Sequence, residues 1–129
     1  MANITIAGNS YVITSEISMA DLETVKKYRP SALALTDAET KETTFKVGIG
    51  SNSISDYGIS FGGVSNGEEK LAAVTLSIPS DVKNAREYVL DRAGLAIANL
   101  NKVEVGIAAA LEEIKTERDI IAESIKVSV

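Results

Sequence analysis

The sequence contains no cysteine, no histidine and no tryptophan, and aromatic residues make up only 5% of it. Without cysteine, disulfides, thiolate metal sites and cysteine nucleophiles are excluded. Without histidine, the chain lacks the commonest metal ligand and the commonest general base near neutral pH. We therefore expect a protein that is not an enzyme and has no cofactor and no metal site, with a core built mainly from Ile, Val, Leu and Ala.

Positive charge and long apolar runs are also scarce. The 13 basic residues are outnumbered by 18 acidic ones, which gives a net charge of −5. No basic block is present to displace counterions, so the composition weighs against binding of nucleic acid or an anionic membrane. No run approaches the roughly 18 apolar residues of a membrane-spanning helix, and the first residues lack the features of a signal peptide. We expect no membrane association and a location in the cytoplasm of the producing cell.

The first 78 residues alternate between short β-rich runs and turn sequences. Asn3–Ala7 and Tyr11–Ser15 flank a Gly-Asn-Ser turn, which predicts a hairpin. Ser18 is placed to cap a short helix that Pro30 ends. Four further strands are predicted: Ala32–Leu35, Thr43–Ile49, Ser53–Phe61 and Leu71–Ile78.

The last two predicted strands are separated by a glycine-rich segment, residues 62–67, which predicts a loop. The strand Leu71–Ile78 has the clearest alternation. Its predicted core face consists of Ala72, Val74, Leu76 and Ile78.

The last third of the chain carries an apolar seam on heptad spacing. Ser80 is the predicted N-cap of a helix that runs to about Ile125, either unbroken or folded back as a hairpin at Asn99–Asn101. Unbroken, this helix would be about 65 Å long, longer than a small globular domain. The final residues, Lys126–Val129, are predicted to form a short strand or a frayed end.

These patterns predict a single α+β domain over residues 1–129. Residues 1–78 form an antiparallel β-sheet with one short helix, and residues 79–126 form a long helix or helical hairpin.

The heptad seam is the candidate functional surface, because so long a stripe must be covered by another helix or by another copy. We expect a homo-oligomer. The candidate self-association residues are Ile97, Leu100, Glu104, Ile107, Leu111, Ile114, Arg118, Ile121 and Ile125.

Two polar residues interrupt this seam, seven residues on either side of Leu111. If two copies crossed antiparallel at Leu111, Glu104 of each would approach Arg118 of the other and fix the register. Alternatively, both side chains lie at the edge of the seam with their charged groups in water.

Patterns that resemble chemical motifs have simpler explanations. Gly48–Ser53 resembles a phosphate-binding loop, but no Gly-Lys-Ser/Thr follows it. Ser80 and Lys83 match the Ser-x-x-Lys spacing of some acyl-enzymes, yet the accompanying motifs are missing. Aromatic residues could also form a platform for stacking bases, although packing in the core or an interface explains them better. These residues are Tyr11, Phe45, Tyr57 and Phe61.

The chain has an ANITIAGN start, a short helix that ends in KYRP, a glycine-rich strand region and a helix that contains IANLNKVE. In this pattern it is similar to small uncharacterised proteins of phages and prophages of Gram-positive gut bacteria. The resemblance implies a virion or mobile-element protein and carries no functional residues. With the seam, it favours a non-enzymatic protein that acts through self-association, most concretely a virion or capsid-associated structural or decoration protein. Its partners would be copies of itself and other virion or host proteins.

Two other functions remain open. The first is an accessory inhibitor that binds a host protein or sequesters a small signalling molecule, for which the acidic surface suits mimicry of nucleic acid. The second is a single-stranded nucleic-acid-binding protein that uses the strand face of Tyr57.

Overall fold

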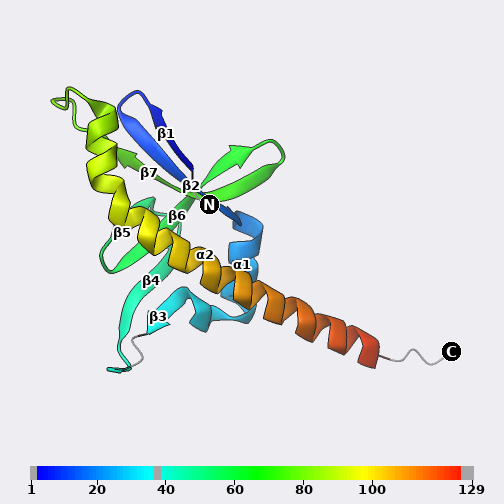
Figure 1. The fold of residues 1–129 in the computed structure, drawn as a ribbon. Coiled ribbons are helices and arrows are strands. Elements are labelled where there is room, and N and C mark those ends of the chain that lie inside the picture. The colour runs from blue at the N-terminus through cyan, green and yellow to red at the C-terminus, as the bar shows by residue number, and fades with distance from the viewer. Residues whose placement is uncertain (1–2, 37–38, 126–129) are drawn as a thin grey trace.

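The computed structural model describes residues 3–36 and 39–125, so the predicted end segment Lys126–Val129 lies outside the described residues. The described residues form seven strands, two α-helices and one 3-10 helix, η1 (Figure 1). In chain order these are β1 (Asn3–Ala7), β2 (Ser10–Ser18), α1 (Met19–Tyr28), η1 (Pro30–Leu33), β3 (Ala34–Thr36), β4 (Thr43–Ile49), β5 (Ser53–Ser55), β6 (Gly58–Asn66), β7 (Glu69–Ser77) and α2 (Ala85–Ser124).

The strands form one mixed sheet in the order β1-β2-β7-β6-β4-β3, and β5 pairs with β6. The α+β prediction is confirmed, but the expectation of a purely antiparallel sheet is wrong, because β4 and β6 are parallel. The chain reverses twice between them. Gly50 and Asn52 adopt positive φ and turn the chain into β5, and Asp56–Tyr57 turns it back into β6. Two reversals return β6 to the direction of β4.

Two predicted boundaries in this region are wrong. The predicted strand Ser53–Phe61 is divided by the turn at Asp56–Tyr57, and the predicted loop 62–67 is mostly the second half of β6, which pairs with β7. Neighbouring side chains lie over Gly62 and Gly63, so the missing Cβ atoms at these two positions leave room for them within the strand. A Cβ atom at Gly62 would overlap the side chain of Asn52.

The local predictions for the N-terminal part are confirmed. β1 and β2 form a hairpin. The hydroxyl oxygen of Ser18 accepts a hydrogen bond from the backbone N–H of Asp21 at 3.1 Å and caps α1. Helix α1 buries Leu22 and Val25 completely and ends at Tyr28, two residues before the proline.

Helix α2 is continuous and bent, so the alternative of a helical hairpin is wrong. Its arms, Ala85–Gly94 and Ala96–Ser124, meet at 50°, whereas Asn99–Asn101 lies within the helix. Ser80 is not the N-cap. The helix begins after Asn84, whose side-chain oxygen accepts a hydrogen bond from the backbone N–H of Glu87 at 3.2 Å. Asn followed by Glu three residues later resembles a capping box. This pair, and not Ser80, therefore determines where the helix begins.

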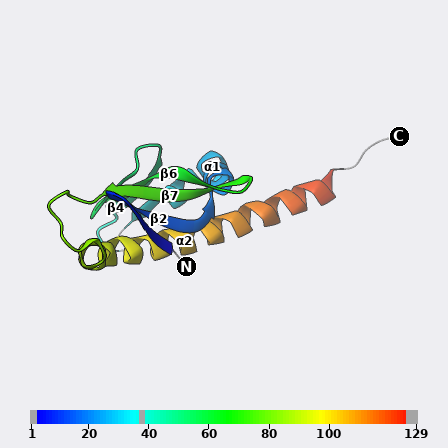
Figure 2. The same cartoon turned by 90° about the horizontal axis from the view of Figure 1, so that it is seen from above.

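Helix α2 runs obliquely across one face of the sheet and extends beyond it (Figures 1 and 2). Alternate residues of the strands form the sheet face that α2 covers. They include the predicted core residues of β7 and Ile78 just after it; of these, Leu76 is half-buried. Helix α2 supplies the other side of the same core through Val89, Ala93, Ala96, Leu100, Val103, Ile107, Ala110 and Ile114. Helix α1 contacts α2, β2 and β7 and extends this core.

Among the helices of the described residues, none alone has the length and apolar character needed to cross a membrane. The two arms of α2 meet that test only when they are counted together across the bend, by length and composition alone.

Packing of α2 on the sheet can be tested at two neighbouring positions of the helix. Ile107 is 1% exposed and Val105 is 72% exposed. We expect Ile107→Ala to lower the free energy of unfolding by about 2–5 kcal/mol, because it leaves a cavity in the core. Val105→Ala is the matched control and should change it by less than about 0.5 kcal/mol. Urea denaturation of both variants measures the difference, and equal effects would contradict this packing.

Burial also makes the stability sensitive to alkaline pH. Burial raises the pKa of the Tyr11 phenol, neighbouring Tyr88 adds to this effect, and Arg92 opposes it. The folded state therefore favours the neutral phenol, so its contribution to stability is complete below the ordinary pKa of 10.0 and is lost as the pH rises through the higher folded value.

We expect Tyr11→Phe to lose less stability than the wild type between about pH 9 and pH 11, where tyrosines ionise. Tyr57→Phe alters an exposed ring and should follow the wild type. Denaturant titrations across this range give the comparison. Parallel curves for all three proteins would argue against ionisation of a buried Tyr11.

Candidate functional site

The acidic side chains of the described residues do not gather into a metal-binding group. Within residues 3–36 and 39–125, no group of three or more Asp or Glu side chains could hold a metal ion. The side chains of Glu16, Asp21 and Glu104 line one hollow between β2, α1 and α2. In this hollow, Oε1 of Glu104 accepts a hydrogen bond from the backbone N–H of Glu16 at 3.2 Å, which joins α2 to β2.

This contact lies at an irregularity of β2. The register with β7 shifts between Thr14 and Ser18, which is typical of a β-bulge. The Ser15 hydroxyl donates to the carbonyl oxygen of Ala72 at 2.7 Å and accepts from the N–H of Ile17 at 3.2 Å. The carboxylate of Glu104 therefore supplies an acceptor where the ladder is interrupted, and it anchors α2 to the strand.

The structure divides the predicted self-association residues into three groups by burial. Leu100, Ile107 and Ile114 are buried in the core of their own chain, so in this fold they are covered without a second copy. Three more are half-buried on the same chain: Ile97, Glu104 and Leu111. The exposed group consists of Arg118, Ile121 and Ile125.

A crossing of two copies at Leu111 stays a prediction, although this part of α2 already has contacts within its own chain. The sheet, α1 and η1 cover α2 on both sides of this residue, up to Ile114. Glu104 has a partner in its own chain, and the guanidinium of Arg118 lies 5.9 Å from the centre of the Tyr28 ring, within range of a cation–π contact. Heptad spacing identified the apolar face, but not what covers it.

A basic side chain holds α2 where the helix leaves the body of the domain. Arg29, directly after α1, binds Glu117 through a guanidinium nitrogen and approaches Glu113 with its Nε 3.8 Å from the carboxylate oxygen. The hydrogen bond to Glu117 raises the pKa of Arg29 despite an opposing desolvation effect, and Coulombic attraction to both glutamates adds to it. The sequence gives no signal for this clamp, because the partners are more than 80 residues apart.

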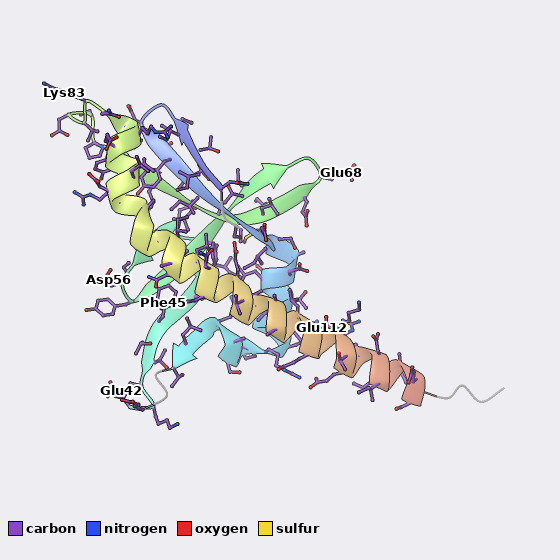
Figure 3. All side chains as sticks on the ribbon, in the orientation of Figure 1. Glu42, Phe45, Asp56, Glu68, Lys83 and Glu112 are labelled. Atoms are coloured by element: carbon purple, nitrogen blue, oxygen red, sulfur yellow. The ribbon has the colours of Figure 1, made fainter. Side chains whose placement is uncertain are left out.

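Beyond the clamp, α2 projects from the domain; Figure 3 labels Glu112, just before the clamp. We call Asp119–Ile125 the α2 tip. It carries three large apolar side chains that are 58–66% exposed: Ile120, Ile121 and Ile125. Ile121 and Ile125 lie four residues apart and continue the stripe of Ile107 and Ile114, whereas Ile120 lies to one side of it. The apolar stripe therefore runs out of the core into solvent.

The proposed aromatic platform is wrong. Tyr11, Phe45 and Phe61 are buried in the core, whereas Tyr57 is exposed at the β5–β6 turn. The residues therefore do not share a surface on which bases could stack. Gly48–Ser53 includes the chain reversal after β4, where the N–H of Ser51 donates to the hydroxyl of Ser60 at 3.1 Å.

Comparison of the chain with known proteins found no matching family model, no matching curated sequence and no matching solved structure.

The Arg29 clamp can be tested through the dynamics of α2. We expect Arg29→Gln to accelerate amide hydrogen exchange over residues 114–120, because it removes the charge that holds Glu113 and Glu117. Exchange over residues 96–107, which pack on the sheet, should not change. Arg86→Gln, at the exposed start of α2, is the control, and mass spectrometry of the exchanged protein provides the measurement. Uniform acceleration along α2 would show that Arg29 does not act locally.

Proposed function

We propose that this protein is a non-enzymatic assembly protein that acts by self-association through the α2 tip. The observation that carries the proposal is the exposure of Ile120, Ile121 and Ile125 on a helix end that projects from the domain. Exposed, clustered apolar side chains mark interaction surfaces.

A second copy of the chain is the occupant that we propose for this surface. Two tips that cross antiparallel present the same pair, Ile121 and Ile125, to each other, so one surface serves both partners. Antiparallel crossing also accounts for Arg118, which shares a heptad position with Ile125. In a parallel pair the two Arg118 side chains would face each other and repel, whereas an antiparallel pair separates them.

Charge distinguishes a second copy from a basic partner. Acidic residues outnumber basic ones over residues 112–124, so two copies repel each other at long range. Because salt screens that repulsion, self-association should strengthen as salt increases. A complex with a basic partner should weaken instead. A tip also buries much less than the roughly 1,600 Å² of a standard interface, so the association should be weak and concentration-dependent.

Sedimentation velocity of two variants tests the proposal. We expect the mass of the wild type to rise with concentration, and Ile121→Asp to reduce this rise, because it places a charge in the apolar contact. Val105→Asp is the matched control: Val105 is equally apolar and exposed, but lies on α2 away from the tip. It should associate as the wild type does. A monomeric wild type at every concentration and salt, or equal behaviour of both variants, would contradict the proposal.

Because of the resemblance to phage and prophage proteins, the setting that we propose for this self-association is a virion, in which the protein is a structural or decoration protein. Quantitative mass spectrometry of purified particles measures its copy number. Several copies per particle support this setting, and absence from the particles contradicts it. Absence together with a monomeric wild type would favour the accessory inhibitor.

A further inference from the structure

The two edges of the sheet are built differently. Edge strand β3 has three residues, its register with β4 shifts between Leu35 and Thr36, and charged residues follow in the connection to β4. Short length, a bulge and nearby charge are the features that protect an edge from pairing with another chain. Edge strand β1 has none of these features. Its sequence, Asn-Ile-Thr-Ile-Ala, contains no charge and no proline, and all five residues pair with β2 in unbroken register.

Strand β1 is exposed along its whole length, and its main contact is with β2. Ile4 pairs with Ile13 and Ile6 pairs with Tyr11, and both partners are buried on the face that packs against α2. Paired residues of neighbouring strands point to the same face. Ile4 and Ile6 therefore extend the apolar core face to the edge of the sheet, where they stay exposed.

The hairpin geometry determines which backbone groups point outward. A two-residue turn, Gly8-Asn9, joins β1 to β2, with Gly8 at a φ of +60° and Ala7 paired with Ser10. The closing pair of such a turn is hydrogen-bonded, and hydrogen-bonded pairs alternate along an antiparallel ladder. The N–H and C=O groups of Asn3, Thr5 and Ala7 therefore point to β2, and those of Ile4 and Ile6 point away from it.

We propose that β1 is a second interface between copies of this chain, in which two β1 strands pair antiparallel about a twofold axis at Thr5. Ile4 of each copy then pairs with Ile6 of the other. The outward backbone groups form about four hydrogen bonds, and the two sheets become continuous. The isoleucines meet on one face and the two Thr5 side chains meet on the other.

The sequence of β1 favours a second copy as the partner and fixes this register. Antiparallel pairing about Thr5 matches isoleucine with isoleucine and threonine with threonine, so one strand complements itself. A shift by two residues would pair Ile4 with Ile4 and move Ile6 opposite residue 2, outside β1. The shift would therefore lose contacts, which keeps the register specific.

This interface uses different residues from the α2 tip, and it goes beyond the proposed function. Strand β1 and the tip lie in different parts of the molecule (Figure 1). A chain with two twofold interfaces forms closed or open assemblies larger than a dimer. If only one of the two surfaces associates, the protein stops at a dimer, and variants at Thr5 and Ile121 show which surface forms it.

Disulfide trapping tests the register directly, because the chain has no cysteine of its own. In the proposed pairing, Thr5 faces Thr5 of the second copy in a non-hydrogen-bonded pair with a Cα separation of about 4.5 Å, close enough for a disulfide. Asn3 faces Ala7, so the two Asn3 residues lie about 14 Å apart at 3.4 Å per residue. Both substitutions are on the same face of the same strand.

We expect oxidised Thr5→Cys to form a covalent dimer on a non-reducing gel, and Asn3→Cys to remain largely monomeric. Both variants should show the wild-type circular dichroism and urea midpoint, which excludes unfolding as the cause. Equal cross-linking of both variants, or none of either, would overturn the proposal. Combining Thr5→Cys with Ile121→Asp separates the surfaces: the covalent dimer should persist even when the tip cannot associate.

Discussion

The length of the apolar stripe on α2 exceeds the surface that its own chain can place against it, and the other features of the structure follow from this mismatch. A helix of 40 residues is about 60 Å long, whereas six neighbouring strands at about 4.8 Å span about 24 Å. Oblique packing lengthens the contact, and α1 and η1 extend the cover to Ile114. Beyond that residue the stripe continues into solvent.

Two polar contacts determine how much of α2 is covered. Glu104 binds the backbone of β2 at its bulge, and Arg29 holds Glu113 and Glu117 where the helix leaves the domain. The apolar stripe of α2 belongs to the core from Val89 to Ile114, and after the Arg29 contact it faces solvent. The uncovered residues at the α2 tip therefore follow from one small sheet that is covered on one face by one long helix.

Local signals predicted the β1–β2 hairpin, the Ser18 cap, the core face of β7 and the long helix, because neighbouring residues determine each of them. The parallel pairing of β4 and β6 depends on two reversals that composition does not distinguish from a continuous strand. The heptad pattern identified the correct face of α2, but it grouped Ile107 with Ile121, because periodicity does not show where the sheet ends. The Arg29 clamp joins segments far apart in sequence, so local patterns could not predict it.

The proposed contact between copies of this chain at the uncovered α2 tip can be measured directly. Because the chain has no cysteine, Glu123→Cys gives a single spin label on the exposed side of the tip, and double electron–electron resonance measures the distance between labels on different copies. Antiparallel tips pack with axes about 8–10 Å apart, so we expect a label distance of about 20–30 Å whose amplitude rises with protein concentration. A signal without such a distance, in samples that sedimentation shows to be associated, would contradict the claim.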